Sequence, residues 1–284
     1  MTETILVTGA SGYIGRHVVK ALCDSGKYDV ICSTRKNSSP DPRATRTNQP
    51  IFDFDAPDFF ARLGSPDRCI HLAWRDGFNH KSNAHLDDLP KHVRFIEKLA
   101  ENGITSISIM GSMHEIGYWE GAVDENTPTN PLSLYGIAKN ALREAASVVL
   151  KDTATQLKWL RAFYLTGDDA SNHSIFSKIL ECANAGKKSF PFNSGTNKYD
   201  FINIDRAAEQ IVLASVQDET NGIINCCSGV PVSLREKVEQ FISENNLDIQ
   251  LEYGAFPDRP YDSPAIWGDA TKIQSILAKS VASQ

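Results

Sequence analysis

A strand that runs through a glycine-rich turn into a helix is the feature that most constrains how this chain can fold. Residues 4–8 form an apolar run typical of a strand, and residues 13–25 carry apolar side chains at helical spacing. Gly9 suits a tight turn, Gly12 lets the backbone approach a phosphate, and Gly15 allows close packing of the helix on the strand. The start of such a helix presents unpaired N–H groups and a partial positive charge. We therefore expect a dinucleotide-binding turn built from Gly9, Gly12, Tyr13, Ile14 and Gly15.

Strand-like and helix-like segments alternate along most of the chain. Further strands are expected at 28–33, 51–54, 68–73, 104–110, 156–163 and 222–227, and further helices at 89–102, 131–150, 174–185 and 205–216. This alternation predicts an α/β fold with a doubly wound parallel sheet of the Rossmann type and right-handed crossovers. After residue 165 the alternation becomes irregular and loops become frequent, which indicates a smaller second lobe.

The two parts of the predicted fold interleave along the chain. We assign residues 1–166 and 199–227 to the Rossmann domain, which binds the cofactor. Residues 167–198 and 228–284 are assigned to a discontinuous substrate-binding lobe. A chain of 284 residues is long enough for both parts.

Composition and charge restrict the partners of the protein. The net charge of −6 gives no basic footprint for nucleic acid, so a phosphorylated substrate would need local basic residues. No apolar run approaches the roughly 20 residues that span a bilayer, and the first residues lack a signal-peptide pattern. We expect a cytoplasmic protein without nucleic-acid or membrane partners. The six cysteines have no metal-ligand spacing, so no metal site is expected.

The end of the second predicted strand bears on the choice of dinucleotide. Folds that prefer NAD usually place an acidic residue there to hold the ribose 2′-hydroxyl, whereas this chain has Ser33-Thr34-Arg35-Lys36. Arg35 and Lys36 suit a 2′-phosphate, which favours NADP(H) over NAD(H), and the alternative is a solvated basic turn. Asp53, followed by Phe54, is a candidate acceptor for the adenine amino group or an ordinary aspartate at a strand end.

A candidate catalytic constellation lies in the middle of the chain. Asn130-Pro131 is typical of a helix start, and on the helix that follows Tyr135 and Lys139 lie four residues apart and share one face. A lysine ammonium near a phenol stabilises the phenolate and lowers the tyrosine pKa, which suits proton transfer near neutral pH. Ser112 ends the preceding strand, at the edge of the sheet where ligands bind.

These segments together resemble the extended short-chain dehydrogenase/reductase family, which comprises nucleotide-sugar epimerases, dehydratases and reductases. The segments that carry the resemblance, in family order, are Thr8–Gly15, His71–Ala73, Gly111-Ser112, Tyr135–Lys139, Tyr199–Asp205 and Gly222–Asn225. The resemblance implies that Ser112, Tyr135 and Lys139 form the catalytic triad. It also implies that Lys139 holds the nicotinamide ribose and that Ala73 lies beside the cofactor.

Departures from the family pattern narrow the range of reactions that this chain is expected to catalyse. Sugar dehydratases of the family carry Asp-Glu directly after the catalytic hydroxyl residue, where this chain has Met113-His114, so dehydration is not favoured. Trp74 stands where the family usually has a small residue. It is a candidate stacking wall for the substrate, with a core residue as the alternative.

Three further positions resemble family sites more loosely. His114 lies two residues after Ser112, where a related reductase that also epimerises its substrate has a cysteine working with a later histidine; His173 resembles that later position. The two histidines are candidates for acid and base, or are simply polar residues of the pocket or surface. Arg259 resembles an arginine that grips the nucleotide diphosphate, or is a surface arginine in a proline-rich turn.

The resulting expectation is NADPH-dependent reduction of a 4-keto nucleotide-activated sugar, with Tyr135 as the proton donor. The enzyme alternative is a nucleotide-sugar epimerase, or a bifunctional epimerase and reductase. The non-enzyme alternative is an NADP-binding regulatory protein, against which an intact Ser112, Tyr135 and Lys139 set argues. Relatives are often dimers, so a homodimer is a further option that the resemblance raises.

Overall fold

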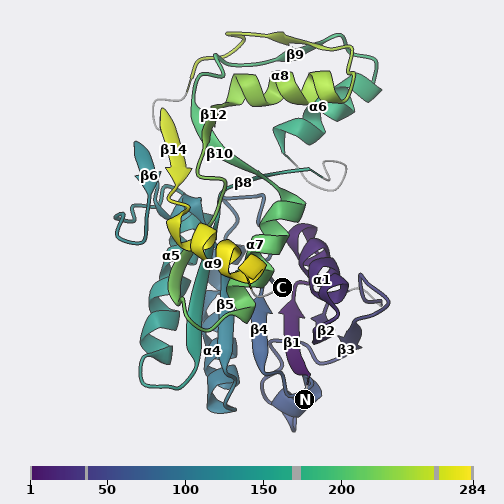
Figure 1. The fold of residues 1–284 in the computed structure, drawn as a ribbon. Coiled ribbons are helices and arrows are strands. Elements are labelled where there is room, and N and C mark those ends of the chain that lie inside the picture. The colour runs from purple at the N-terminus through teal and green to yellow at the C-terminus, as the bar shows by residue number, and fades with distance from the viewer. Residues whose placement is uncertain (1, 36–37, 168–173, 259–261, 283–284) are drawn as a thin grey trace.

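The computed structural model describes residues 2–35, 38–167, 174–258 and 262–282. Its larger part is a parallel seven-stranded sheet in the order β11-β7-β5-β4-β1-β2-β3 (Figure 1). The strands are β1 Glu3–Thr8, β2 Tyr28–Ser33, β3 Thr45–Thr47, β4 Arg68–His71, β5 Ser106–Ser112, β7 Gln156–Ala162 and β11 Gly222–Cys226. Chain order reverses beside β1, which pairs with β2 on one side and with β4 on the other. A ligand crevice forms at such a reversal, outside the carboxyl ends of the strands.

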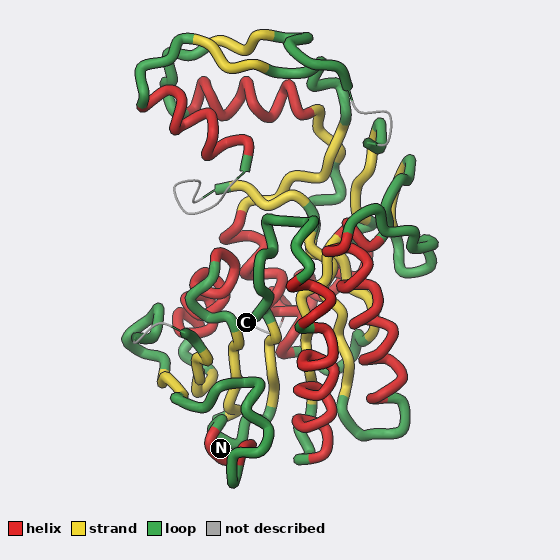
Figure 2. The backbone as a smooth tube through the Cα atoms, turned by 180° about the vertical axis from the view of Figure 1, so that it is seen from behind, coloured by secondary structure: helices red, strands yellow, loops and turns green. Residues whose placement is uncertain are grey.

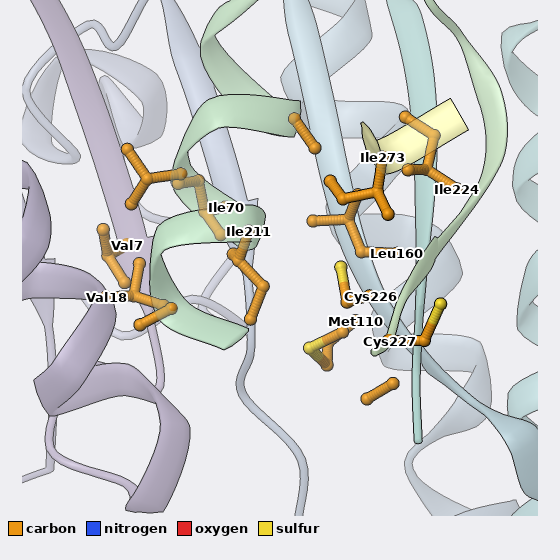
Figure 3. Close-up of a cluster of buried hydrophobic side chains, with 14 of the residues drawn as sticks. Val7, Val18, Ile70, Met110, Leu160, Ile211, Ile224, Cys226, Cys227 and Ile273 are labelled. Carbon is orange, nitrogen blue, oxygen red and sulfur yellow. The ribbon is translucent and has the colours of Figure 1, made fainter. Parts of the chain in front are cut away.

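Helices cover both faces of this sheet, as the strand–helix alternation predicts. The alternating side chains of β1 demonstrate the two layers. Ile5 and Val7 join one hydrophobic cluster, which includes residues of α1 (Tyr13–Ser25), α7 (Ile204–Val216) and α9 (Thr271–Ala282), and part of which is drawn in Figure 3. Leu6 points into the opposite cluster, together with residues of α2 (Phe59–Arg62), α4 (Leu89–Glu101) and α5 (Leu134–Leu150).

A smaller lobe lies beyond the carboxyl ends of the large sheet (Figures 1 and 2). It contains α6 Ile175–Asn184, α8 Leu234–Glu244, β9 Ser189–Pro191 and β13 Gln250–Glu252, and it has its own hydrophobic cluster. A second sheet in the order β12-β10-β14-β6, with β8 beside β10, lies between the lobe and the large sheet. Its strands are β6 Gly121–Val123, β8 Tyr164–Thr166, β10 Lys198–Asn203, β12 Pro231–Ser233 and β14 Ala265–Gly268.

Two elements lie apart from the domain to which the sequence assigned them. Strand β10 belongs to the second sheet, although it falls in the predicted Rossmann segment 199–227. Helix α9 packs on the large sheet through Ile273 and Ile276, although it falls in the predicted lobe segment 228–284. The domain limits therefore stay a prediction.

The third strand was predicted at the wrong place. Residues 51–54 form turns, in which the Asp53 N–H donates to the Pro50 carbonyl at 3.2 Å, and β3 is the earlier segment Thr45–Thr47. This short strand is polar and lies at the edge of the sheet, so it lacks the apolar pattern on which the prediction relied. Among the described residues, no helix is both long and apolar enough to cross a membrane.

Candidate active site

The turn after β1 has the shape needed to hold a dinucleotide phosphate. Gly9 has a φ of 67°, and a Cβ atom on it would lie 2.7 Å from the backbone nitrogen of Ala73. A Cβ on Gly15 would lie 2.2 Å from the Gly9 carbonyl oxygen, so only glycine allows α1 to approach so closely. A Cβ on Gly12 would meet only that same oxygen, at 3.1 Å, which leaves the space beside the turn open. Because no described side chain caps α1, its first N–H groups suit a pyrophosphate. The turn therefore fits the predicted cofactor class.

The other predicted cofactor residues lie around this turn or outside the described residues. Tyr13 donates its hydroxyl to the Gly167 carbonyl at 2.7 Å, and Ile14 packs against the core. The Ala73 N–H donates to Thr8 Oγ1 at 3.2 Å, which places Ala73 at the carboxyl end of β1. Arg35 is exposed at the end of β2, and Lys36 lies outside the described residues.

The predicted adenine contacts are placed differently from one another. Asp53 is exposed, whereas Phe54 is half-buried and packs on Phe52 and Phe59 with ring centroids 6.2 and 5.8 Å apart. The structure therefore brings Phe54 into the core beside α2. Contacts of either residue with adenine stay a prediction.

Ser112, Tyr135 and Lys139 come together as the sequence predicts. Ser112 is the last residue of β5 and caps the short 3-10 helix η1 (Met113–Glu115), where its Oγ accepts the His114 N–H at 3.3 Å. The other two residues lie on α5, whose N-cap is Ser133 rather than the predicted Asn130. Pro131 remains outside the helix, because the capping hydroxyl accepts the Gly136 N–H at 3.1 Å.

The Lys139 ammonium is buried and held from two sides. Its Nζ donates to the Met110 carbonyl at 2.7 Å and lies 3.7 Å from the centroid of the Trp74 ring, a cation–π contact. Burial lowers the pKa of Lys139 to about 7, and the Glu115 carboxylate opposes this change. The lysine can thus change its protonation state in the physiological range.

The environment of Tyr135 differs from our expectation that Lys139 lowers its pKa. Burial raises the pKa of Tyr135 to about 12, with a hydrogen bond to the Ser112 side chain acting in the opposite direction. The Lys139 ammonium lies 5.9 Å from the centroid of the phenol ring and is bonded to a carbonyl oxygen. In the protein without cofactor, Tyr135 is therefore a protonated phenol at neutral pH, which is the form that a proton donor requires.

A histidine cluster surrounds these residues, and most of its members are not marked by the sequence. The His80 ring stacks on Tyr135, and its edge meets His114 with centroids 4.4 Å apart. His85 accepts the indole N–H of Trp74 at 3.0 Å, and the same indole stacks on His92 at 4.6 Å. The cluster comprises His71, His80, His85, His92 and His114. No sequence motif marks His80, His85 and His92, because they come from a loop and from two different helices.

Trp74 and His114 are the predicted substrate contacts that the structure describes. Trp74 is half-buried, packs on the core and covers Lys139, so the core alternative describes its present contacts. Burial lowers the pKa of His114 to about 4, which leaves its imidazole neutral at pH 7. A neutral imidazole suits hydrogen bonding to a substrate better than donation of a full proton. His173 and Arg259, the other predicted residues, lie outside the described residues. Substrate contacts stay predictions for all four.

Comparison with known proteins identifies the family. The family model described as "NAD dependent epimerase/dehydratase family" matches residues 5–227. The chain belongs to this family. It is an oxidoreductase of the extended short-chain dehydrogenase/reductase type, as its motifs predict.

One relative and two solved structures are similar to this chain over nearly its whole length. The relative is dTDP-6-deoxy-L-talose 4-dehydrogenase (NAD(+)) of Aggregatibacter actinomycetemcomitans, 44% identical over 268 residues, which are 93% of this chain and 98% of that protein. MoeE5, solved with UDP-glucuronic acid and NAD, has a TM-score of 0.79 at 24% identity, covering 97% of this chain and 92% of its own. The UDP-glucose 4-epimerase of Thermus thermophilus, solved with NAD, has a TM-score of 0.79 at 18% identity, covering 96% and 92%. These two likenesses establish the fold.

The predicted preference for NADP(H) is wrong. The relative is named for NAD(+), and both solved structures hold NAD. Arg35 is an exposed side chain, so it fits the alternative of a solvated basic turn at the end of β2. A basic residue at this position permits a 2′-phosphate without requiring one, and an exposed charge gains little from such a contact. Within the described ranges, no three His, Cys, Asp or Glu side chains are grouped to hold a metal ion.

Proposed function

We propose that this protein interconverts a 4-hydroxyl and a 4-keto group on a nucleotide-linked sugar, with NAD(H) as the cofactor. The observation that carries the proposal is the convergence of Ser112, Tyr135 and Lys139 at the carboxyl edge of the large sheet. The glycine turn after β1 supplies a phosphate site at the same edge.

Each side chain has a role that its environment supports. The chemistry supplied by bound NAD is hydride exchange with carbon 4 of the sugar. In the direction of reduction, Tyr135 donates its proton to the oxygen on carbon 4, and the Ser112 hydroxyl donates a hydrogen bond to that oxygen. Protonated Lys139 stabilises the phenolate that Tyr135 becomes, which lowers the barrier to proton donation. In the direction of oxidation the same groups take up the proton.

The substrate class is inferred from the relative with 44% identity, which is named for a dTDP-linked 6-deoxy-L-talose. The site is consistent with a 6-deoxy sugar, because an aromatic wall continues from His114 to Tyr164 and then to Tyr199, with ring centroids 6.3 and 4.6 Å apart. Such a wall offers an apolar surface to a methyl group at carbon 6.

The test is to incubate the protein with NAD+ and a panel of dTDP- and UDP-linked hexoses with and without a hydroxyl at carbon 6. We expect NADH formation, followed by absorbance, to be fastest with a dTDP-linked 6-deoxyhexose, and product NMR to place the new carbonyl at carbon 4. The reverse reaction uses the 4-keto sugar and NADH. Absence of NADH formation with every member of the panel, together with retained NAD binding, contradicts the proposal.

An epimerase is the second candidate, since UDP-glucose 4-epimerase of Lactobacillus helveticus matches 96% of this chain at 22% identity. A 4-epimerase keeps its cofactor and needs no added NAD+, so turnover of purified protein without free cofactor favours it.

Epimerisation at carbon 3 or 5 would place deuterium at those carbons in deuterated water. We expect none, because the neutral His114 is a weak acid for returning such a proton.

A further inference from the structure

Glu115 is a fully buried residue that lies three positions after Ser112 in the chain. It ends η1, and its Oε1 accepts the Ser112 N–H at 2.6 Å. The indole N–H of Trp159, on β7, donates to both carboxylate oxygens at 3.1 and 3.0 Å. The Arg161 guanidinium approaches Oε2 at 3.5 Å from the same strand. A carboxylate in this place is thus held from β5 and from β7.

The pocket around Glu115 is built for the ionised form. Each of these described partners donates, so a protonated carboxyl group would find no acceptor among them. Gly111 makes room for the group, because a Cβ there would lie 2.8 Å from Glu115 Oε1 and 2.1 Å from Trp159 Nε1. Burial raises the pKa of Glu115, and the charge of Arg161, followed by the hydrogen bonds from Ser112 and Trp159, opposes this rise by favouring the ionised form.

Lys139 needs a counter-charge, since a buried ammonium without one is strongly disfavoured. Glu115 is placed to supply it, because the Met110 carbonyl that accepts from Lys139 and the Ser112 N–H that donates to Glu115 are two residues apart on β5 and point to the same edge of that extended strand. The phenol of Tyr135 faces Lys139 from the same helix, α5. The groups that face it from neighbouring elements are Glu115 on η1, the Met110 carbonyl on β5, and the rings of His71 on β4 and His92 on α4. Burial lowers the pKa values of both histidines, so their rings are neutral at pH 7. Arg161 also approaches the Glu115 carboxylate, so Arg161 and Lys139 share this one counter-charge.

We propose that Glu115 is a positioning residue that keeps the catalytic Lys139 protonated through its negative charge, while its hydrogen bond fixes the backbone of Ser112. One residue thereby links the geometry of the hydroxyl donor to the charge of the lysine. The inference rests on the proposed function for the roles of Ser112 and Lys139, but not for the electrostatic link itself.

The experiment measures the titration of Lys139 directly, in the protein without cofactor. Lysine labelled with carbon-13 and nitrogen-15 is followed by NMR across pH 5–11, and Lys139→Met identifies the signal. In Glu115→Gln the amide oxygen can still accept the Ser112 N–H, but the charge is lost. We expect the Lys139 midpoint to fall by at least about one pH unit, as for loss of a nearby opposite charge. On a substrate that turns over, the alkaline limb of the kcat profile should move down in the same direction.

A matched control comes from α8. Ser112 and Glu115 form a capping box, and Ser233 and Glu236 form the same motif, in which Glu236 accepts the Ser233 N–H at 3.1 Å. Glu236→Gln changes the same motif away from the site and should leave the Lys139 midpoint unchanged. If Glu115→Gln does not fold, Trp159→Phe removes one donor from the carboxylate and should lower the midpoint by a smaller amount. An unchanged midpoint in a folded Glu115→Gln overturns the inference, even where the enzyme turns over. A lowered midpoint in a protein that oxidises no sugar supports the inference and contradicts the proposed function.

Discussion

The ring of His80 lies parallel to the ring of Tyr135, with centroids 4.8 Å apart and an interplanar angle of 9°. The His80 carbonyl also accepts the Tyr135 backbone N–H, at 3.2 Å. A loop residue therefore fixes both the backbone and the ring of the candidate proton donor. Burial lowers the pKa of His80, so the stacked ring is neutral at pH 7.

We expect His80→Ala to reduce kcat/KM by about 2- to 12-fold, because an aromatic pair contributes about 0.5–1.5 kcal/mol beyond its buried area. His80→Phe keeps a ring in this place and should retain most of the activity. Steady-state kinetics on the best sugar of the panel makes the comparison. Equal losses in the two variants would mean that the imidazole nitrogens, rather than the stacking, are what matters.

Tyr135→Phe tests the proton donor. The change removes the hydroxyl and keeps the ring, so the contacts with His80 and Trp74 should survive. Turnover should fall by roughly 10²- to 10⁴-fold, as for loss of a general acid. NAD affinity, measured by calorimetry, should stay close to that of the unmodified protein. A variant with nearly full activity would rule out Tyr135 as the donor.

Arg35→Ala tests the corrected assignment of the cofactor. Because Arg35 is exposed, we expect its loss to change KM for NAD+ by no more than about fivefold, the effect of an exposed contact of about 1 kcal/mol. The unmodified protein should have a higher kcat/KM with NAD+ than with NADP+. Preference for NADP+, abolished in the variant, would restore the 2′-phosphate role.

Buried histidines should make the fold sensitive to acid. Burial lowers the pKa of His92 to about 3 and of His114 to about 4, whereas both titrate near 6.5 in the unfolded chain. Between pH 6.5 and 4 the unfolded chain therefore binds more protons, and the free energy of unfolding falls as pH falls. Each histidine contributes at most about 1.4 kcal/mol per pH unit.

Urea unfolding at pH 6.5, 5.5 and 4.5 measures this slope. His114→Asn should give a shallower slope than the unmodified protein, because it removes one group that takes up a proton on unfolding. A slope that is identical in the unmodified protein and in His114→Asn would contradict the assignment.

Asp200 connects the second sheet to the loop after β11. Its buried carboxylate accepts the N–H groups of Ser228, Gly229 and Gly268 at 2.8, 2.9 and 3.1 Å, and the Ser228 hydroxyl at 2.6 Å. Asp200→Ala should lower the free energy of unfolding by at least about 3 kcal/mol, because several buried donors lose a charged acceptor. Asp205→Ala, at an exposed carboxylate, should lower it by no more than about 1 kcal/mol in the same urea experiment.

The local sequence pattern was sufficient to predict those features of the protein that depend on residues close together in the chain. The sequence by itself determined the strand, glycine turn and helix at residues 4–25, and the placement of Tyr135 and Lys139 on one helix face. It also contained a capping box at Ser233 and Glu236, a signal for α8 that could have been used. These features depend on side-chain periodicity and on backbone geometry within a few residues.

Sheet order and burial decided what the sequence left open. His80, His85 and His92 meet Trp74 and Tyr135 because β4, α4 and α5 are neighbours in the folded protein, and no spacing in the chain encodes that contact. Strand β3 exists because it pairs with β2, despite its polar composition. The pKa values of Lys139 and Tyr135 follow from desolvation, which only the packed structure specifies.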